Sequence, residues 1–117
     1  MDIGFIGVGF MGRHMVKHIV NGGHKLTVFD LNLEATKEIQ SMGATLASSP
    51  REVAESSEVI FTSLPKPQNV EEVVLGEGGI LSGAAHGTTY FDLSTTDPLT
   101  LQRITTAAES KGVKVLD

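Results

Sequence analysis

The chain has 117 residues, of which 40% are hydrophobic and 20% charged, and its formal net charge is −5 at pH 7. A chain of this length suffices for one hydrophobic core, so a single domain is expected, and its acidic balance disfavours nucleic acids and anionic membranes as partners. The absence of cysteine excludes disulfides and thiolate chemistry, and the lack of a signal peptide or a long apolar run favours a cytoplasmic protein.

Strand-like and helix-like segments alternate along the whole chain. Short apolar runs indicate the strands, and apolar residues recurring every three or four positions indicate the helices. Asn32, Ser49 and Asp97 are expected helix N-caps, while Gly43 and Gly112 suit helix ends. The expected strands are residues 3–8, 25–29, 44–47, 59–64, 88–93 and 113–116, and the expected helices are residues 10–20, 33–42, 50–56, 69–75 and 98–111, with a short helical turn at 80–84.

This alternation predicts an α/β protein of the Rossmann type. The expected architecture is a single domain with a doubly wound, mostly parallel six-stranded sheet and helices on both faces. Ligands of such sheets bind beyond the carboxyl ends of the strands, where the strand order reverses. Residues 7–12, 30–32, 64–69 and 94–98 follow those ends, so we expect the chemistry of this protein there.

The first turn carries the motif Gly-x-Gly-x-x-Gly directly after a strand and at the start of a helix. Gly7 permits a tight turn, Gly9 lets backbone N–H groups approach a pyrophosphate, and Gly12 leaves room for helix–strand packing. The helix N-terminus adds unpaired N–H groups and the positive end of its dipole. About 20 positions on, Asp30 would accept hydrogen bonds from the ribose of adenosine. The predicted dinucleotide site comprises Gly7, Val8, Gly9, Phe10, Met11, Gly12 and Asp30.

Two other interpretations of the motif remain open. One is a glycine turn that packs a helix and holds no ligand, and the other is a different nucleotide-like ligand, such as a methyl donor. If a nicotinamide dinucleotide binds, Asp30 favours NAD, because a carboxylate bonds a free 2′-hydroxyl and repels a 2′-phosphate. Leu31 and Asn32 follow it, so no adjacent arginine is present to pair with that phosphate. NAD is therefore the expected cofactor and NADP the alternative.

Four stretches of the chain carry a family resemblance. They are GFIGVGFMG, GHKLTVFD, the strand end Ser63-Leu64-Pro65 and, above all, the segment DLSTTDP at residues 92–98. Together they resemble the 3-hydroxyacid dehydrogenases, the group that contains 3-hydroxyisobutyrate dehydrogenase and tartronate semialdehyde reductase. The resemblance covers the entire chain and implies an oxidoreductase that transfers a hydride between NAD(P) and a short 3-hydroxyacid.

The resemblance also implies roles for individual residues. Residues 7–12 would hold the pyrophosphate and Asp30 the adenosine ribose. For the loop at residues 94–97, the alternative is plain helix capping by Asp97. The remaining implied contacts are Leu64, Pro65 and Asn69 on the ribose and nicotinamide side of the cofactor, Thr95 at the nicotinamide, and Ser94 at the edge of the substrate pocket.

The chain departs from the family at its end. In the family, a strand like residues 113–117 leads into a C-terminal helical domain that brings the catalytic lysine, and that domain is absent here. Residues 1–117 are thus expected to be an NAD(P)-binding domain with no catalytic residue and negligible turnover alone. In the complete enzyme the partners would be a small hydroxyacid and further copies of the chain. His14 and His18 are four residues apart but lack a third ligand, so no metal site is expected.

The alternative is a non-catalytic module that binds a dinucleotide or docks on a partner protein. The two interpretations differ in what they predict for residues 113–116. In the cofactor half of an enzyme, this end strand and the neighbouring helix should leave apolar surface exposed. A stand-alone module should cover that edge or pair it in an oligomer.

Overall fold

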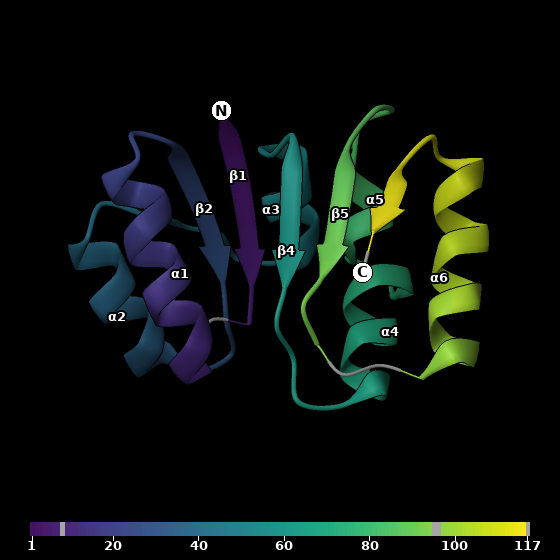
Figure 1. Ribbon diagram of the computed structural model, residues 1–117, viewed down its shortest axis with the longest axis horizontal. Coiled ribbons are helices and arrows are strands. Elements are labelled where there is room, and N and C mark those ends of the chain that lie inside the picture. Colours follow the sequence, from purple (N-terminus) through teal and green to yellow (C-terminus); the bar gives the residue numbers. More distant parts are fainter. Residues whose placement is uncertain (8, 95–96, 117) are drawn as a thin grey trace.

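The computed structural model of the protein describes residues 1–7, 9–94 and 97–116, and strands and helices alternate along it (Figure 1). Each expected element is present, with bounds that differ by two residues at most. The fourth helix was expected to begin at residue 69 but begins at Pro67, because proline suits the first helical position. The strands are β1 (Asp2–Ile6), β2 (Lys25–Phe29), β3 (Thr45–Leu46), β4 (Val59–Thr62), β5 (Thr89–Asp92) and β6 (Lys114–Leu116). The helices are α1 (Gly9–Asn21), α2 (Leu33–Ser41), α3 (Pro50–Glu55), α4 (Pro67–Leu75), α5 (Ile80–Gly83) and α6 (Pro98–Ser110).

The six strands form one sheet in the order β3-β2-β1-β4-β5-β6, and every neighbouring pair is parallel. The predicted doubly wound Rossmann architecture is therefore confirmed. From β1 the chain winds outward to β3, crosses back, and winds in the other direction from β4 to β6. The strand order thus reverses between β1 and β4, and their carboxyl ends meet at one edge of the sheet.

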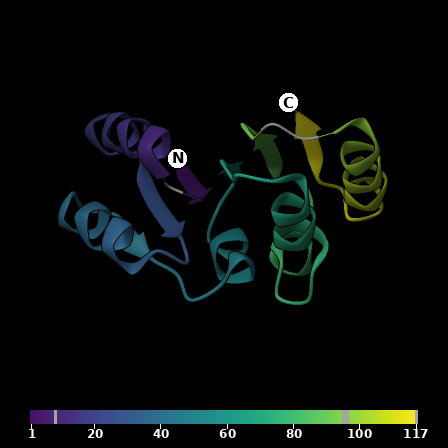
Figure 2. The same ribbon diagram turned by 90° about the horizontal axis from the view of Figure 1, so that it is seen from below.

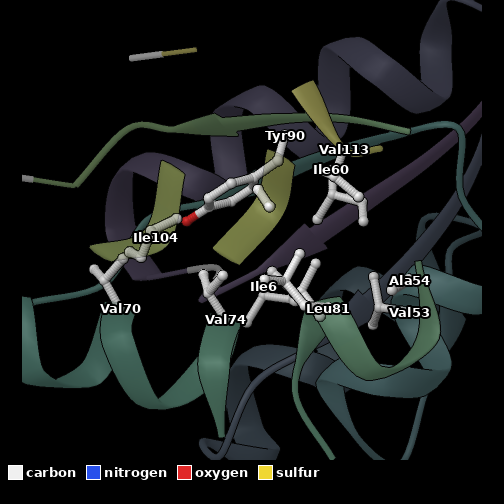
Figure 3. Close-up of a cluster of buried hydrophobic side chains, with 12 residues drawn as sticks. Ile6, Val53, Ala54, Ile60, Val70, Val74, Leu81, Tyr90, Ile104 and Val113 are labelled. Atoms are coloured by element: carbon white, nitrogen blue, oxygen red, sulfur yellow. The ribbon is translucent and has the colours of Figure 1, made fainter. Parts of the chain in front are cut away.

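Helices cover both faces of the sheet. In Figure 1, α1 and α2 lie in front of it and α3, α4 and α5 lie behind it, an arrangement that Figure 2 shows from below. The cluster behind the sheet contains Ile6 of β1, Ile60 of β4 and Tyr90 of β5, with the Tyr90 ring lying across it (Figure 3). The buried members of the front cluster are Ile3, Phe5, Val16, Leu26, Val28, Ile39 and Ala44.

One part of the sheet face is less covered than the rest. Phe5, Phe61 and Phe91 form a row across β1, β4 and β5, with ring centroids 6.0 and 5.3 Å apart. Phe5 is fully buried, whereas Phe61 and Phe91 are only partly buried, and none of the described helices lies in front of β4 and β5 in Figure 1. Leu116 on β6 and Leu99 on α6 are 36% and 57% exposed. Apolar side chains are therefore exposed at this end of the sheet, as expected if the chain is the cofactor-binding half of an enzyme.

Asp97 caps α6, as expected from the sequence. Its carboxylate accepts the backbone N–H of Thr100 at 2.8 Å and the Thr100 hydroxyl at 3.1 Å. The bond from the Thr100 N–H is the main reason why the pKa of Asp97 lies below its ordinary value. Because the folded pKa is the lower one, the stabilisation is present above the unfolded pKa and is lost as the pH falls through the folded pKa.

We therefore expect Asp97→Ala to lower the melting temperature by a few degrees at pH 7, and by less at about pH 3. Thermal unfolding followed by circular dichroism at both pH values measures the difference. Asp97→Asn retains a capping oxygen without a titrating charge, so it is the matched control and should lose little at either pH. An equal loss for Asp97→Ala at both pH values would contradict the role of the charged cap.

Candidate nucleotide-binding site

The turn after β1 is built around Gly7, whose φ is +82°. Its N–H donates to the carbonyl of Phe29 at 3.0 Å, which joins the turn to the end of β2. A Cβ at this position would lie 2.3 Å from the carbonyl oxygen of Ser63 and 2.6 Å from Cδ2 of Leu64. Both the left-handed backbone and the close contact with the loop after β4 therefore require glycine.

The helix that follows is packed closely on its strand. A Cβ at Gly12 would lie 3.2 Å from Cε1 of Phe5 and 3.4 Å from the carbonyl oxygen of Gly7, which supports the packing role inferred from the sequence. Because α1 begins at Gly9, the predicted residues Phe10 and Met11 belong to its first turn, whose backbone N–H groups have no partner within the helix. Such a helix start is suited to anionic phosphate oxygens. Val8 lies outside the described residues.

Asp30 directly follows β2, on the neighbouring strand end. One oxygen of its carboxylate accepts the backbone N–H of Asn32 at 2.9 Å. Asn32 in turn caps α2, because its side chain accepts the N–H groups of Glu34 and Ala35. The acid is thus held at the carboxyl edge of the sheet by a turn that is itself fixed to a helix.

A cavity of about 430 Å³ lies at this edge, within the size range of small-molecule sites. It brings together the predicted residues Gly7 and Asp30 with Leu64, Pro65 and Asn69, although these come from three separate loops and the first turn of α4. The lining residues are Ile6, Gly7, Phe29, Asp30, Leu31, Pro50, Leu64, Pro65, Asn69, Glu72, Val73, Glu77, Gly78 and Gly79.

The sequence analysis missed the wall formed by α4 and the turn after it. Glu72 and Val73 follow Asn69 by three and four residues, so helical spacing would have found them once Asn69 was chosen. The turn at residues 76–79 contributes Glu77, Gly78 and Gly79 to this wall. It reaches the cavity because the N–H of Arg51 donates to the carbonyl of Gly78 at 2.9 Å, a contact between distant segments that no local pattern indicates.

A buried polar network lies beside the site, at the ends of β4 and β5. The hydroxyl oxygens of Thr62 and Tyr90 are 2.6 Å apart, and the Thr62 hydroxyl donates to the Asp92 carboxylate at 3.1 Å. With that donation made, the Tyr90 hydroxyl donates to Thr62. Burial, together with the nearby charge of Asp92, raises the pKa of Tyr90, so this hydroxyl stays protonated and available as a donor.

The network extends into the loops that were predicted to carry function. The same oxygen of Asp92 accepts the N–H of Ser94 at 2.8 Å, and the Ser94 hydroxyl accepts the N–H of Leu64 at 2.6 Å. Ser94 thus joins the loop after β5 to the loop after β4, and it is not among the described residues that line the cavity. Thr95, predicted to reach the nicotinamide, lies outside the described residues.

The described residues contain neither a cluster of metal ligands nor a membrane-spanning helix. His14 and His18 are exposed on α1, and no group of three or more His, Cys, Asp or Glu in residues 1–7, 9–94 and 97–116 could hold a metal ion. Within the same ranges, no helix has the length and apolar character needed to cross a membrane.

The strand order of the parallel sheet reverses beside a glycine turn and the start of a helix, and an acid follows the second strand. This combination defines a dinucleotide-binding α/β domain. The family model for the NAD binding domain of 6-phosphogluconate dehydrogenase matches residues 2–117. The chain belongs to this family and is an NAD(P)-binding domain.

Known proteins agree with the resemblance to 3-hydroxyacid dehydrogenases. The chain is 37% identical over 115 residues to probable 3-hydroxyisobutyrate dehydrogenase-like 3 of Arabidopsis thaliana, covering 98% of this chain and 36% of that protein. It is 36% identical to 3-sulfolactaldehyde reductase of Escherichia coli, over 98% of this chain and 39% of the reductase. The solved structure of Mycobacterium tuberculosis 3-hydroxyisobutyrate dehydrogenase has a TM-score of 0.88 at 27% identity, over 97% of this chain and 38% of that one. The chain thus spans less than half the length of these relatives.

Proposed function

We propose that this domain serves an oxidoreductase that transfers a hydride between NAD and a short 3-hydroxyacid. The observation that carries the proposal is the cavity that joins the Gly7 turn to Asp30 at the point where the strand order reverses. The substrate class is supported by the relatives, of which several are named as 3-hydroxyisobutyrate dehydrogenases. When bound, NAD would supply the hydride acceptor and NADH the donor.

We assign the two halves of the cofactor to different parts of the edge. The start of α1 and the backbone of residues 7–12 would bind the pyrophosphate, while Asp30 would bond the adenosine ribose. The shared cavity supports contacts of Leu64, Pro65 and Asn69 with the ribose beside Asp30. Their contact with the nicotinamide side, the contact of Thr95 with the nicotinamide and the place of Ser94 near the substrate remain predictions from the family resemblance.

The reduction of a carbonyl also needs an acid beside the developing alkoxide. We nominate no residue of this chain for that role, and we expect the chain alone to show negligible turnover. A non-catalytic module that binds a dinucleotide and docks on a partner is the second candidate, although the exposed Leu99 and Leu116 fit the cofactor half of an enzyme better than a stand-alone module. Steady oxidation of 3-hydroxyisobutyrate by the purified chain would exclude that candidate.

The decisive test is calorimetric titration with NADH and NADPH of the wild-type chain and of Asp30→Ala. We expect NADH to bind more tightly than NADPH, and the variant to bind NADH about 10 to 100 times more weakly because it loses hydrogen bonds to a charged group. Glu34→Ala removes an acid from the same turn without touching the cavity lining, so it controls for net charge. A folded wild-type chain that binds neither nucleotide would contradict the proposal.

A cytoplasmic location and assembly into a homo-oligomer are also part of the proposal. Relatives from Arabidopsis thaliana and Dictyostelium discoideum are named as mitochondrial proteins, so relatives differ in this respect from the location proposed here. Cell fractionation measures the location, and light scattering of the purified protein measures the assembly.

A further inference from the structure

The cavity beside Asp30 contains two more carboxylates. Glu72 on α4 and Glu77 on the turn after it line the same cavity. Both residues are exposed, and neither forms an ion pair or a side-chain hydrogen bond with a described residue. No Lys, Arg or His is present among the described residues that line the cavity. The charged side chains that line it are therefore all acidic.

A neighbouring acid on the same helix has a different setting. The carboxylate of Glu71 pairs with the guanidinium of Arg103 on α6 at 2.8 Å, and Glu71 does not line the cavity. Its charge is thus largely balanced by a partner. In contrast, Glu72 and Glu77 present unbalanced charge to any ligand in the cavity.

We propose that Glu72 and Glu77 act with Asp30 as determinants of cofactor specificity, and that they exclude dinucleotides with a phosphate on the adenosine ribose 2′-hydroxyl. This proposal rests on the proposed function. A ribose bonded to Asp30 would hold its 2′ position inside the cavity that Glu72 and Glu77 line. A phosphate there carries nearly two negative charges at pH 7, and it would lie in a cavity whose charged lining side chains, among the described residues, are all acidic.

The contributions of the three acids differ in kind. Asp30 would lose a direct hydrogen bond to the 2′-hydroxyl when the phosphate is present, and that loss depends little on salt. Glu72 and Glu77 would act through space across solvent, so their repulsion should be screened as the Debye length falls from about 10 Å at 0.1 M salt to about 3 Å at 1 M. The salt dependence of cofactor discrimination therefore separates the two effects.

The test uses the variant Glu72→Gln/Glu77→Gln, which keeps side-chain size and removes two charges. At low salt we expect its affinity for NADPH to rise about 5- to 20-fold, and its affinity for NADH, which carries less negative charge, to rise by a smaller factor. At 1 M salt the NADPH affinities of variant and wild type should converge. Titration of ADP-ribose and 2′-phospho-ADP-ribose should reproduce both results, because the effect concerns the adenosine half.

Glu71→Gln is the matched control, because it removes one charge from α4 outside the cavity and should leave the ratio of NADH to NADPH affinity unchanged. An unchanged ratio in the double variant, with NADH still bound, would overturn this inference and leave the proposed function intact. An equal rise of NADPH affinity in Glu71→Gln would also overturn it, since net charge alone would then be responsible. A wild-type chain that binds neither dinucleotide would refute the proposed function and this inference together.

Discussion

Gly7→Ala is expected to lower the free energy of unfolding by about 3 kcal/mol and to abolish measurable NADH binding. The new methyl group would lie 2.3 Å from the carbonyl oxygen of Ser63, with the φ of residue 7 at +82°. That carbonyl cannot move easily, because the N–H of the same residue, Ser63, donates a hydrogen bond to the carbonyl oxygen of Ile6 at 3.0 Å. The turn would have to open, and the start of α1 would move with it. Urea unfolding and calorimetric titration measure the two effects.

Gly23→Ala separates the clash at Gly7 from the cost of its backbone conformation. Gly23 has a φ of +83°, almost the same as that of Gly7, but a Cβ there would meet nothing within 4 Å. This control should cost only about 1 kcal/mol, with NADH affinity unchanged. Equal destabilisation by the two substitutions would show that the contact with the loop after β4 is unimportant.

Asp92→Ala is the second substitution with a large expected effect, a loss of about 2 to 4 kcal/mol in the free energy of unfolding. It leaves the N–H of Ser94 and the hydroxyl of Thr62 without their acceptor, and Asp92 is only 6% exposed. Asp92→Asn retains the accepting oxygen and should lose less than half as much. Urea unfolding of both variants measures the difference.

The same substitution should also weaken cofactor binding, because Asp92 positions Ser94, whose hydroxyl holds the N–H of Leu64 in the cavity wall. We expect Asp92→Ala to reduce NADH affinity about tenfold at a temperature where it is fully folded. Tyr90→Phe is the control, because Thr62 still donates to Asp92 without the tyrosine hydroxyl. It should lose about 1 kcal/mol of stability and keep its affinity for NADH. Unchanged NADH affinity in Asp92→Ala would limit this network to a structural role.

Much of the fold could be predicted because its determinants are local. The segment from β1 to Asp30 combines a strand, a glycine turn, an amphipathic helix and a second strand within about 30 residues, a unit in which each part supports the others. The N-caps Asn32 and Asp97 bond backbone groups two or three residues away, so their patterns are readable without tertiary structure. The parallel sheet then follows from the alternation of strands and helices.

The site was predictable only in part. The glycine motif and Asp30 were found because their spacing along the chain is characteristic, and the cavity unites them with Leu64, Pro65 and Asn69. The turn at residues 76–79 was not predicted as part of the site because its place depends on a contact of Gly78 with Arg51 on another helix. The role of Asp92 was not predicted from the sequence, because its partners lie on a neighbouring strand and in the following loop.

The succession of elements, the glycine turn and the acid that follows β2 can be inferred from local patterns, because period, capping and turn geometry act over a few residues. Long-range packing is needed to bring separate loops to one cavity, to place Glu72 and Glu77 in its lining, and to join Ser94 to Leu64. Those relations depend on how strands far apart in sequence pair and how α4 packs behind them. Packing of this kind is set by the fit of the whole core, which no single stretch of the chain contains.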